Sequence, residues 1–352
     1  MSESIYEMKK LSPEVLFVIQ SVIRGEGYRE LHSPARPYPH QGCAWNKKND
    51  SSQQKRRMKD MTIKNDKLTV EFTTLGGTFT SIRNAAGREY LWQGDPDFWK
   101  GQAPICFPIC GSLRNNTAVT IEGKTLSMPR HGIVKDREFE VVDQTETSIT
   151  FRLTCDELLK EKYPYEFSFE TSYVLEENMI HITYRVNNLG DVKIPYTMGG
   201  HTGFKCPLDE GEDYSDYVVE FDQPEQDTVP TPVAATALLD TQNRMPIPQE
   251  GKRLCLSHDL FLNDLLCYDH LKSSVVTLKH KDEEKGVRVC FPDLPYLVLW
   301  SSKNGGNFLC IEPWSGTCTA EDEDDIYDHK PGVAYVKPGQ KGEIHFSYEI
   351  IG

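Results

Sequence analysis

The feature that most constrains the fold of this chain is an alternation of apolar and polar residues, repeated in separate stretches after residue 60. A period of two places one set of side chains on each face of a strand, so each stretch predicts a half-buried antiparallel β-strand. The stretches are Leu68–Phe72, Ile149–Leu153, Phe167–Tyr173, Ile180–Val186, Val287–Phe291 and Ile344–Tyr348.

Turn signals separate the predicted strands. They include Glu122-Gly123, Glu176-Glu177-Asn178 and Asn304-Gly305-Gly306, which are typical of hairpin connections. No repeat of 20 to 50 residues is evident, which disfavours a propeller. We therefore predict an all-β protein with one large antiparallel β-sandwich from residue 61 to residue 352.

The first 60 residues follow a different pattern. Ser12 as N-cap and Pro13 at the first helical position precede apolar residues at helical spacing, up to Gly25. A polar, proline-containing stretch from about residue 33 to residue 60 is typical of a linker. We predict two parts: an extension over 1–60 with one short helix and a flexible linker, and a β-sandwich domain over 61–352.

Charge and hydropathy exclude several classes of function. The net charge is −14, and the first 60 residues are net basic, so the acidic excess lies in the predicted sandwich. An acidic surface repels phosphate backbones and anionic lipid, so we expect neither nucleic acid nor a membrane as a partner. The sequence has no apolar run of 18 residues and no signal-peptide pattern at its start, and we expect a cytoplasmic location.

The ten cysteines do not form a recognisable framework. No CxxC pair occurs, and several cysteines lie in apolar runs such as Ile105–Cys110, which favours buried free thiols. Cys255 and His258 have a spacing that metal ligands can have, but a single such pair is more often structural. We therefore expect no metal site.

Four segments interrupt the strand pattern with small residues and place ionisable groups beside glycine or proline, where loops and strand ends face a cleft. Their polar centres are Arg114, His131, His201 and Glu312. The segments are Phe107–Asn115, Met128–Ile133, Met198–Phe204 and Cys310–Gly316.

Taken in this order, the four segments resemble the aldose 1-epimerase (galactose mutarotase) superfamily, and the RHG, GGHxxF and CIEPW strings are most similar to its bacterial LacX-like branch. The resemblance covers residues 61–352 and leaves 1–60 without a counterpart. It implies a galactose mutarotase-like β-sandwich and an isomerase that interconverts the α and β anomers of a free hexose, such as glucose or galactose, without a cofactor.

The resemblance also implies roles for the residues. Glu312 would take the proton from the anomeric hydroxyl, His201 would protonate the ring oxygen, and His131 would orient or share that proton. Such proton transfers need groups that titrate near neutrality. Arg114 would bind sugar hydroxyls, and Asp264 would bind a hydroxyl on the far side of the sugar, although Asp269 could serve instead.

The sequence leaves open the role of two tryptophans and the choice among three functions. Trp300 and Trp314 could form a platform for a sugar face or could pack in the core. A hexose 6-phosphate 1-epimerase is a rival within the superfamily and would need a cluster of Arg and Lys for the phosphate. A non-catalytic sugar-binding or regulatory module on the same fold is the other rival, although the sequence keeps both the acid and the base. Monomer and homodimer are both compatible with the sequence.

Overall fold

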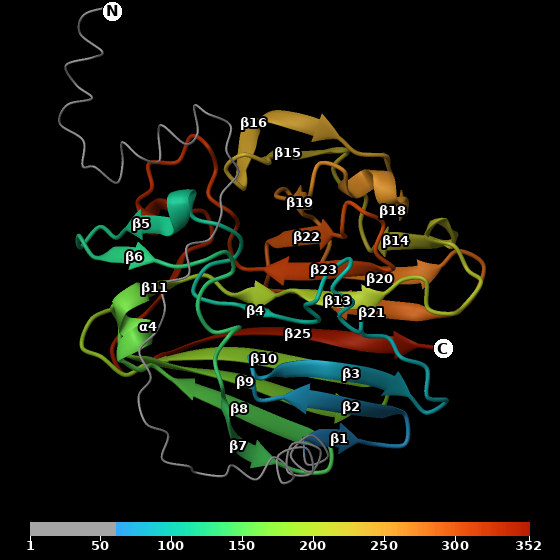
Figure 1. Cartoon of the computed structure of the whole chain (residues 1–352), viewed down its shortest axis with the longest axis horizontal. Coiled ribbons are helices and arrows are strands. Elements are labelled where there is room, and N and C mark those ends of the chain that lie inside the picture. The colour runs from blue at the N-terminus through green and yellow to red at the C-terminus, as the bar shows by residue number, and fades with distance from the viewer. Residues whose placement is uncertain (1–60) are drawn as a thin grey trace, which may run out of the picture. The chain divides into compact units, whose positions relative to one another are not determined.

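The computed structural model describes residues 61–352. The helix and linker predicted for residues 1–60 lie outside the described residues. The largest element is a ten-stranded antiparallel sheet in the order β17-β18-β14-β20-β21-β25-β10-β9-β8-β7 (Figure 1). Its strands are β7 (Glu140–Gln144), β8 (Ser148–Thr154), β9 (Phe167–Glu176), β10 (Met179–Asn188), β14 (Tyr217–Phe221), β17 (Gln249–Glu250), β18 (Arg253–Cys255), β20 (Val275–His280), β21 (Gly286–Cys290) and β25 (Lys341–Ile351).

Two smaller sheets pack against this layer. A six-stranded sheet has the order β19-β22-β23-β12-β4, with β13 also paired to β23, and a three-stranded sheet has the order β1-β2-β3. The strands of the six-stranded sheet are β4 (Ile105–Cys106), β12 (Gly199–Gly200), β13 (Thr202–Lys205), β19 (Leu266–Tyr268), β22 (Tyr296–Trp300) and β23 (Phe308–Trp314). Those of the three-stranded sheet are β1 (Thr62–Lys64), β2 (Leu68–Thr73) and β3 (Thr78–Asn84).

The remaining elements are short. Three two-stranded pairs are β5 (Thr117–Val119) with β6 (Thr125–Ser127), β11 (Ile194–Tyr196) with β24 (Ala334–Val336), and β15 (Thr228–Val233) with β16 (Leu238–Pro246). The helical elements are α4 (Glu157–Lys162) and the 3-10 turns η2 (Arg114–Asn116), η3 (Tyr214–Asp216), η4 (His258–Phe261) and η5 (Tyr327–His329). None of the helices in residues 61–352 is long and apolar enough to cross a membrane.

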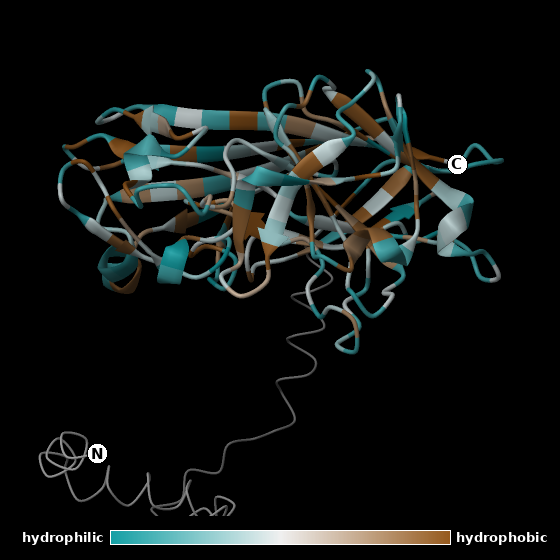
Figure 2. Cartoon of the chain, turned by 90° about the horizontal axis from the view of Figure 1, so that it is seen from above, coloured by the Kyte–Doolittle hydropathy of each residue, from teal (hydrophilic) through white to brown (hydrophobic). Residues whose placement is uncertain are grey.

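The alternating stretches form strands as predicted. In β10 buried and half-buried residues alternate along the whole strand, and β10 pairs with β9 on one side and β25 on the other. Brown and teal segments alternate along several strands in Figure 2 for the same reason. The predicted turn between β9 and β10 contains Glu177 at φ 51°, a left-handed conformation typical of tight turns. The all-β sandwich is confirmed.

Side chains join the layers across a shared core. The hydroxyl of Tyr348 on β25 donates to Thr202 Oγ1 on β13 at 2.8 Å, and its ring lies 5.0 Å from that of Phe204. On the other half of the large sheet, the Tyr173 hydroxyl donates to the Gly77 carbonyl next to β3 at 2.8 Å. The six-stranded and the three-stranded sheets therefore cover the same face of the ten-stranded sheet.

Strand β23 is buried on both of its faces. Leu309 and Ile311 belong to the main core between the sheets, whereas Cys310, Glu312 and Trp314 alternate with them and point to the opposite face. The neighbouring strand β22 repeats the division, with Leu297 and Leu299 in the main core and Val298 and Trp300 outside it. The second face of the six-stranded sheet is thus free to form the floor of a cavity.

Candidate active site

A cavity of about 650 Å³ lies against this second face of the six-stranded sheet. Its lining brings together residues from β22, from β23, from the junction of β12 and β13, and from two loops that are distant in sequence. The sequence-predicted residues that line it are His131, His201, Trp300, Glu312 and Trp314.

A larger and more open groove of about 860 Å³ lies over the ten-stranded sheet. Its carboxylate Glu170 is already neutralised: Arg152 Nε donates to Glu170 Oε1 at 2.8 Å, and Arg185 Nη1, from β10 outside the groove lining, donates to Glu170 Oε2 at 2.6 Å. A surface ion network of this kind leaves no acid or base poised for chemistry. The cavity over the six-stranded sheet is therefore the candidate active site.

Glu312 is a carboxyl group buried on β23. Its side chain is 2% exposed, and its Oε2 has no hydrogen-bond partner within residues 61–352. The imidazole of His201 lies beside it, with its Nε2 3.5 Å from Oε2, a distance too long for a strong hydrogen bond. Burial raises the pKa of Glu312 well above its usual range, against the opposing effect of the Arg130 guanidinium. A carboxyl with a raised pKa suits a general base.

His201 lies at the junction of β12 and β13, over β23. Its ring stacks on Trp99, with centroids 5.1 Å apart and an angle of 22° between the planes, and Trp300 meets it edge-on at 5.8 Å. Burial lowers the pKa of His201 to about 3, and the nearby charge of Arg130 acts in the same direction. A glycine precedes the junction at position 199 because a Cβ there would lie 2.5 Å from Trp314 Cδ1.

His131 lies in a tight loop beside His201. Its φ is +65°, and the two imidazole rings meet edge-on with centroids 4.9 Å apart. His131 Nδ1 accepts the backbone N–H of Gly111 at 3.2 Å, which assigns the proton of the neutral ring to Nε2. Burial lowers the pKa of His131 well below its usual range, and repulsion from His201 adds to the shift. His131 is therefore a neutral donor beside the cavity.

The loop holds this geometry through Gly132. Its φ is +79°, and a Cβ at this position would lie 2.0 Å from the carbonyl oxygen of Phe107. Only glycine combines that conformation with that approach. In the sequence Arg-His-Gly at 130–132, the glycine is therefore required by the backbone, and Arg130 and His131 line the cavity.

Arg114 does not reach the cavity that the sequence analysis assigned to it. Its Nε donates to both carboxylate oxygens of Asp325 at 2.9 Å, and its Nη2 donates to the carbonyls of Ala320 and Glu321. The guanidinium therefore anchors the acidic loop 321–325. Its partner is 211 residues away in the sequence, so no local pattern indicates this contact.

Arg130, which the sequence analysis passed over, supplies the guanidinium of the cavity. Its Nη2 lies 3.6 Å from Asp264 Oδ2, and Asp264 Oδ1 accepts the indole N–H of Trp300 at 2.9 Å. Asp264 is thus connected to two residues of the cavity wall. Asp269, its alternative, is held by Arg244 at 2.8 Å in a different pocket. The position of Arg130 next to His131 in the RHG string was the available signal.

The two predicted tryptophans have different surroundings. Trp314 is fully buried, and its indole N–H donates to the Gly200 carbonyl at 3.1 Å, which fixes the junction that carries His201. Trp300 is half-buried and forms a wall together with Trp99, which the sequence analysis also missed. Core packing describes Trp314, whereas Trp300 and Trp99 present aromatic surface to the cavity.

Comparisons with known proteins match most of the described chain. The sequence model of a family described as aldose 1-epimerase matches residues 59–331. Protein LacX of Lactococcus lactis subsp. lactis is 43% identical over 294 residues, which cover 82% of this chain and 98% of that protein. A galactose mutarotase related enzyme from Lactobacillus acidophilus is 33% identical with a TM-score of 0.76, covering 83% of this chain and 96% of its own. A galactose mutarotase-like protein from Lactobacillus casei ATCC 334 also has a TM-score of 0.76, at 26% identity and 82% and 99% coverage.

Proposed function

Because the chain belongs to the aldose 1-epimerase family, we propose that it is a mutarotase that interconverts the α and β anomers of a free hexose, such as glucose or galactose, without a cofactor. The observation that carries the proposal is the pair formed by Glu312 and His201, 3.5 Å apart in the cavity, with pKa values shifted in opposite directions. Pairs of titratable groups with divergent pKa values are typical of acid and base roles.

Mutarotation moves two protons and leaves the protein unchanged. In our assignment, Glu312 accepts the proton of the anomeric hydroxyl while His201 donates a proton to the ring oxygen, which opens the ring. The carbonyl that forms rotates, and the ring closes on its other face as both protons return. His131, with its proton on Nε2, orients the group that receives the proton from His201.

Burial favours the neutral form of both groups, since it opposes either charge. The reactive form, a carboxylate and an imidazolium, contains the same number of protons and is reached by a proton shift between Glu312 and His201. A sugar hydroxyl that donates to Glu312 Oε2 would replace its missing partner, and Arg130 favours the carboxylate. Sugar binding would thereby help to prepare the charged pair.

Substrate contacts follow from the walls of the cavity. Arg130 and Asp264 offer a donor and an acceptor for hydroxyls, and Trp99 and Trp300 offer apolar surface for the C–H face of a pyranose. In this proposal Arg130 takes the role that the sequence analysis gave to Arg114.

A phosphorylated hexose is the second candidate. Besides Arg130, the cavity is lined by Lys100 and Lys135, two cations that could hold a phosphate. Lys135 also pairs with Asp136 at 2.5 Å, which reduces its free charge. A free hexose therefore remains the substrate that we propose, and a hexose 6-phosphate is included in the experiment that tests it.

Polarimetry tests the proposal directly. Freshly dissolved α-glucose, α-galactose and α-glucose 6-phosphate are followed with the wild type, with Glu312→Gln and with His201→Asn. We expect faster mutarotation of a free hexose by the wild type and a loss of roughly 10²–10⁴-fold in each variant. Acceleration of the 6-phosphate alone, lost in a Lys100→Ala and Lys135→Ala double variant, would replace the free hexose as substrate. No acceleration of any sugar would contradict the enzyme and favour a binding module.

A further inference from the structure

We propose that His201, Cys310 and Glu312 form a binding site for Zn²⁺ that overlaps the acid and base pair and switches the active site off. The inhibitory part of this proposal rests on the proposed function, whereas the binding of the ion does not. Spacing along the chain does not reveal such a site, because these three residues meet only in the folded sheet.

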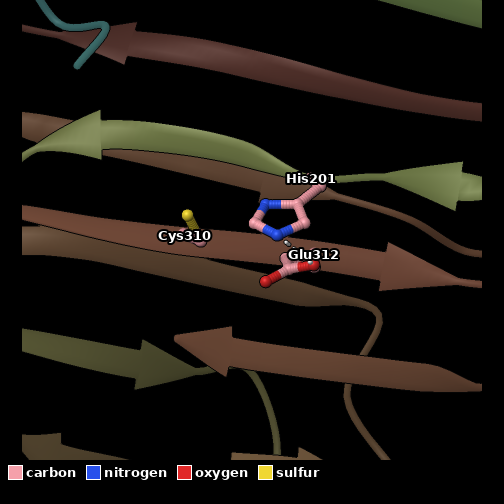
Figure 3. Close-up of side chains that lie close together, drawn as sticks. All are labelled: His201, Cys310 and Glu312. Carbon is pink, nitrogen blue, oxygen red and sulfur yellow. Dashed lines mark ion pairs between the residues drawn. The ribbon is translucent and has the colours of Figure 1, made fainter. Parts of the chain in front are cut away.

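The geometry comes from two neighbouring elements. Cys310 and Glu312 are two residues apart on β23 and therefore share a face of the strand, and His201 projects over them from the junction of β12 and β13 (Figure 3). One nitrogen of the imidazole, the thiol sulfur and a carboxylate oxygen all lie within 4.8 Å of one another. His201 and Glu312 line the cavity, so an ion that enters it meets two of the three ligands directly.

A second observation points to a ligand at this place. His201 Nδ1 and Glu312 Oε2 are buried and have no hydrogen-bond partner within residues 61–352. Buried polar atoms are nearly always paired, and leaving one unpaired destabilises the fold. During the proposed reaction a sugar hydroxyl would donate to Glu312. When no sugar is bound, an ion would use lone pairs of His201 and Glu312.

The ligand types select zinc. Imidazole nitrogen, thiolate sulfur and carboxylate oxygen are the donors that Zn²⁺ prefers, and three protein ligands leave the fourth position to water or a sugar hydroxyl. Mg²⁺ and Ca²⁺ prefer oxygen ligands and disfavour sulfur. A thiolate and a carboxylate together neutralise the two charges of the ion, so the buried site with zinc carries no net charge and avoids the cost of an unpaired charge.

Zinc binding is incompatible with the proposed reaction. The ion occupies the imidazole nitrogen and the carboxylate oxygen that would otherwise transfer protons, and the protons of the Cys310 thiol and of the Glu312 carboxyl leave to solvent when it binds. Because the ion replaces these protons, zinc affinity should rise with pH. Cys310 has no role in the proposed proton transfers. Substituting it can therefore separate zinc binding from mutarotation.

The test uses the full chain after dialysis against EDTA. Zn²⁺ is titrated while mutarotation is followed by polarimetry, and Co²⁺ is titrated in parallel as a probe whose thiolate charge-transfer absorption reports a sulfur ligand. We expect full activity without metal, inhibition by Zn²⁺ and no inhibition by Mg²⁺. Cys310→Ser and Cys310→Ala should keep their mutarotation and need at least about 100-fold more zinc for inhibition, since even outer-shell partners contribute roughly 10–100-fold to affinity.

Cys255→Ser is the matched control, because Cys255 is an exposed thiol on β18 in the ten-stranded sheet. It should be inhibited like the wild type. Equal inhibition of the wild type and both Cys310 variants would overturn the site, as would activity that EDTA removes and zinc restores. If no sugar is turned over, the proposed function fails, but the cobalt absorption and its loss in Cys310→Ser still decide whether the ion binds.

Discussion

At the scale of single residues, the candidate site depends on two ionisable groups that the fold keeps uncharged. Glu312 Oε2 and His201 Nε2 lie 3.5 Å apart, and burial shifts the pKa of the first group upward and of the second downward. An acid with a lowered pKa releases its proton readily, and a base with a raised pKa accepts one readily. This arrangement favours catalysis at the expense of stability.

The stability of the protein should therefore change with pH in a way that Glu312→Gln removes. In the unfolded chain Glu312 ionises at about pH 4.3, whereas in the folded protein its pKa is raised, so between the two values the folded state holds one more proton. The contribution of Glu312 to the free energy of unfolding is therefore fully present below the pKa of the unfolded chain. It falls as pH rises toward the pKa of the folded protein, by up to about 1.4 kcal/mol per pH unit.

Urea unfolding of wild type and Glu312→Gln at a series of pH values checks this expectation. As pH rises above about 4.3, the free energy of unfolding of the variant should increase relative to that of the wild type, although we expect the variant to be inactive. Glu250→Gln, at an exposed position on β17, should follow the wild type throughout. Parallel curves for wild type and Glu312→Gln would show that Glu312 ionises normally in the folded protein.

The two arginines provide a second expectation at this scale. Arg130→Met should lower kcat/KM on the order of 10–100-fold, which corresponds to the loss of a charged hydrogen bond to the sugar, with little change in stability. Arg114→Met should leave kcat/KM unchanged and lower the free energy of unfolding by about 1–3 kcal/mol, since it releases Asp325 and the carbonyls of the acidic loop. Polarimetry and urea unfolding measure both quantities, and a kinetic defect in Arg114→Met would return that residue to the site.

At the scale of elements, the loop that carries Arg130 and His131 is fixed by one close backbone approach. Gly132 is at φ +79° with the Phe107 carbonyl in the position of a Cβ, whereas Gly123, in the turn between β5 and β6, is at φ +80° with open space around it. The two glycines differ in their surroundings and hardly in their backbone conformation.

This pair allows the effect of the close approach to be separated from the effect of φ. Gly123→Ala should cost about 1–2 kcal/mol of stability from the left-handed conformation alone and leave activity intact. Gly132→Ala should cost roughly 1–3 kcal/mol more and also lower kcat, because the loop must move and take His131 with it. Equal effects of the two substitutions on stability and none on kcat would mean that the loop accommodates the methyl group without moving His131.

Sequence patterns predict where the strands of this fold lie better than they predict which residues of a strand point to the same side. The strands with alternating residues, such as β10, are visible because one face is buried and the other is not. Strand β23 is buried on both faces, so its sequence is nearly continuously apolar and does not reveal that Cys310 and Glu312 share a side. The site residues His131, His201 and Glu312 were found through ordered motifs, while the exchange of Arg114 for Arg130 depends on a contact across 211 residues.

At the scale of the whole molecule, the layers of residues 61–352 account for both the core and the cavity. The ten-stranded sheet covers one face of the six-stranded sheet, and the other face of the smaller sheet carries the candidate active site. The family model begins to match at residue 59, and protein LacX is covered almost completely by 82% of this chain.

We accordingly expect a variant that begins at Met61 to be soluble and fully active, with a Tm close to that of the full chain. The apolar residues at helical spacing before Gly25 give the contrary expectation, because a stable amphipathic helix must bury its apolar face. Size-exclusion chromatography, thermal unfolding and polarimetry of the two chains decide between them. Aggregation of the shorter chain, or loss of most of its activity, would make residues 1–60 an integral part of the protein.

The burial of β23 on both faces has a consequence for how the protein can adapt to its substrate. Strands in the middle of a packed sheet open only when the surrounding structure unfolds, so backbone amides along 308–314 should belong to the slowest class in hydrogen exchange. Glu312 then has almost no freedom to follow the sugar. Trp99 and Lys100 line the cavity from a loop outside the sheets, so under the proposed function we expect substitutions in that loop to change hexose preference without loss of the reaction.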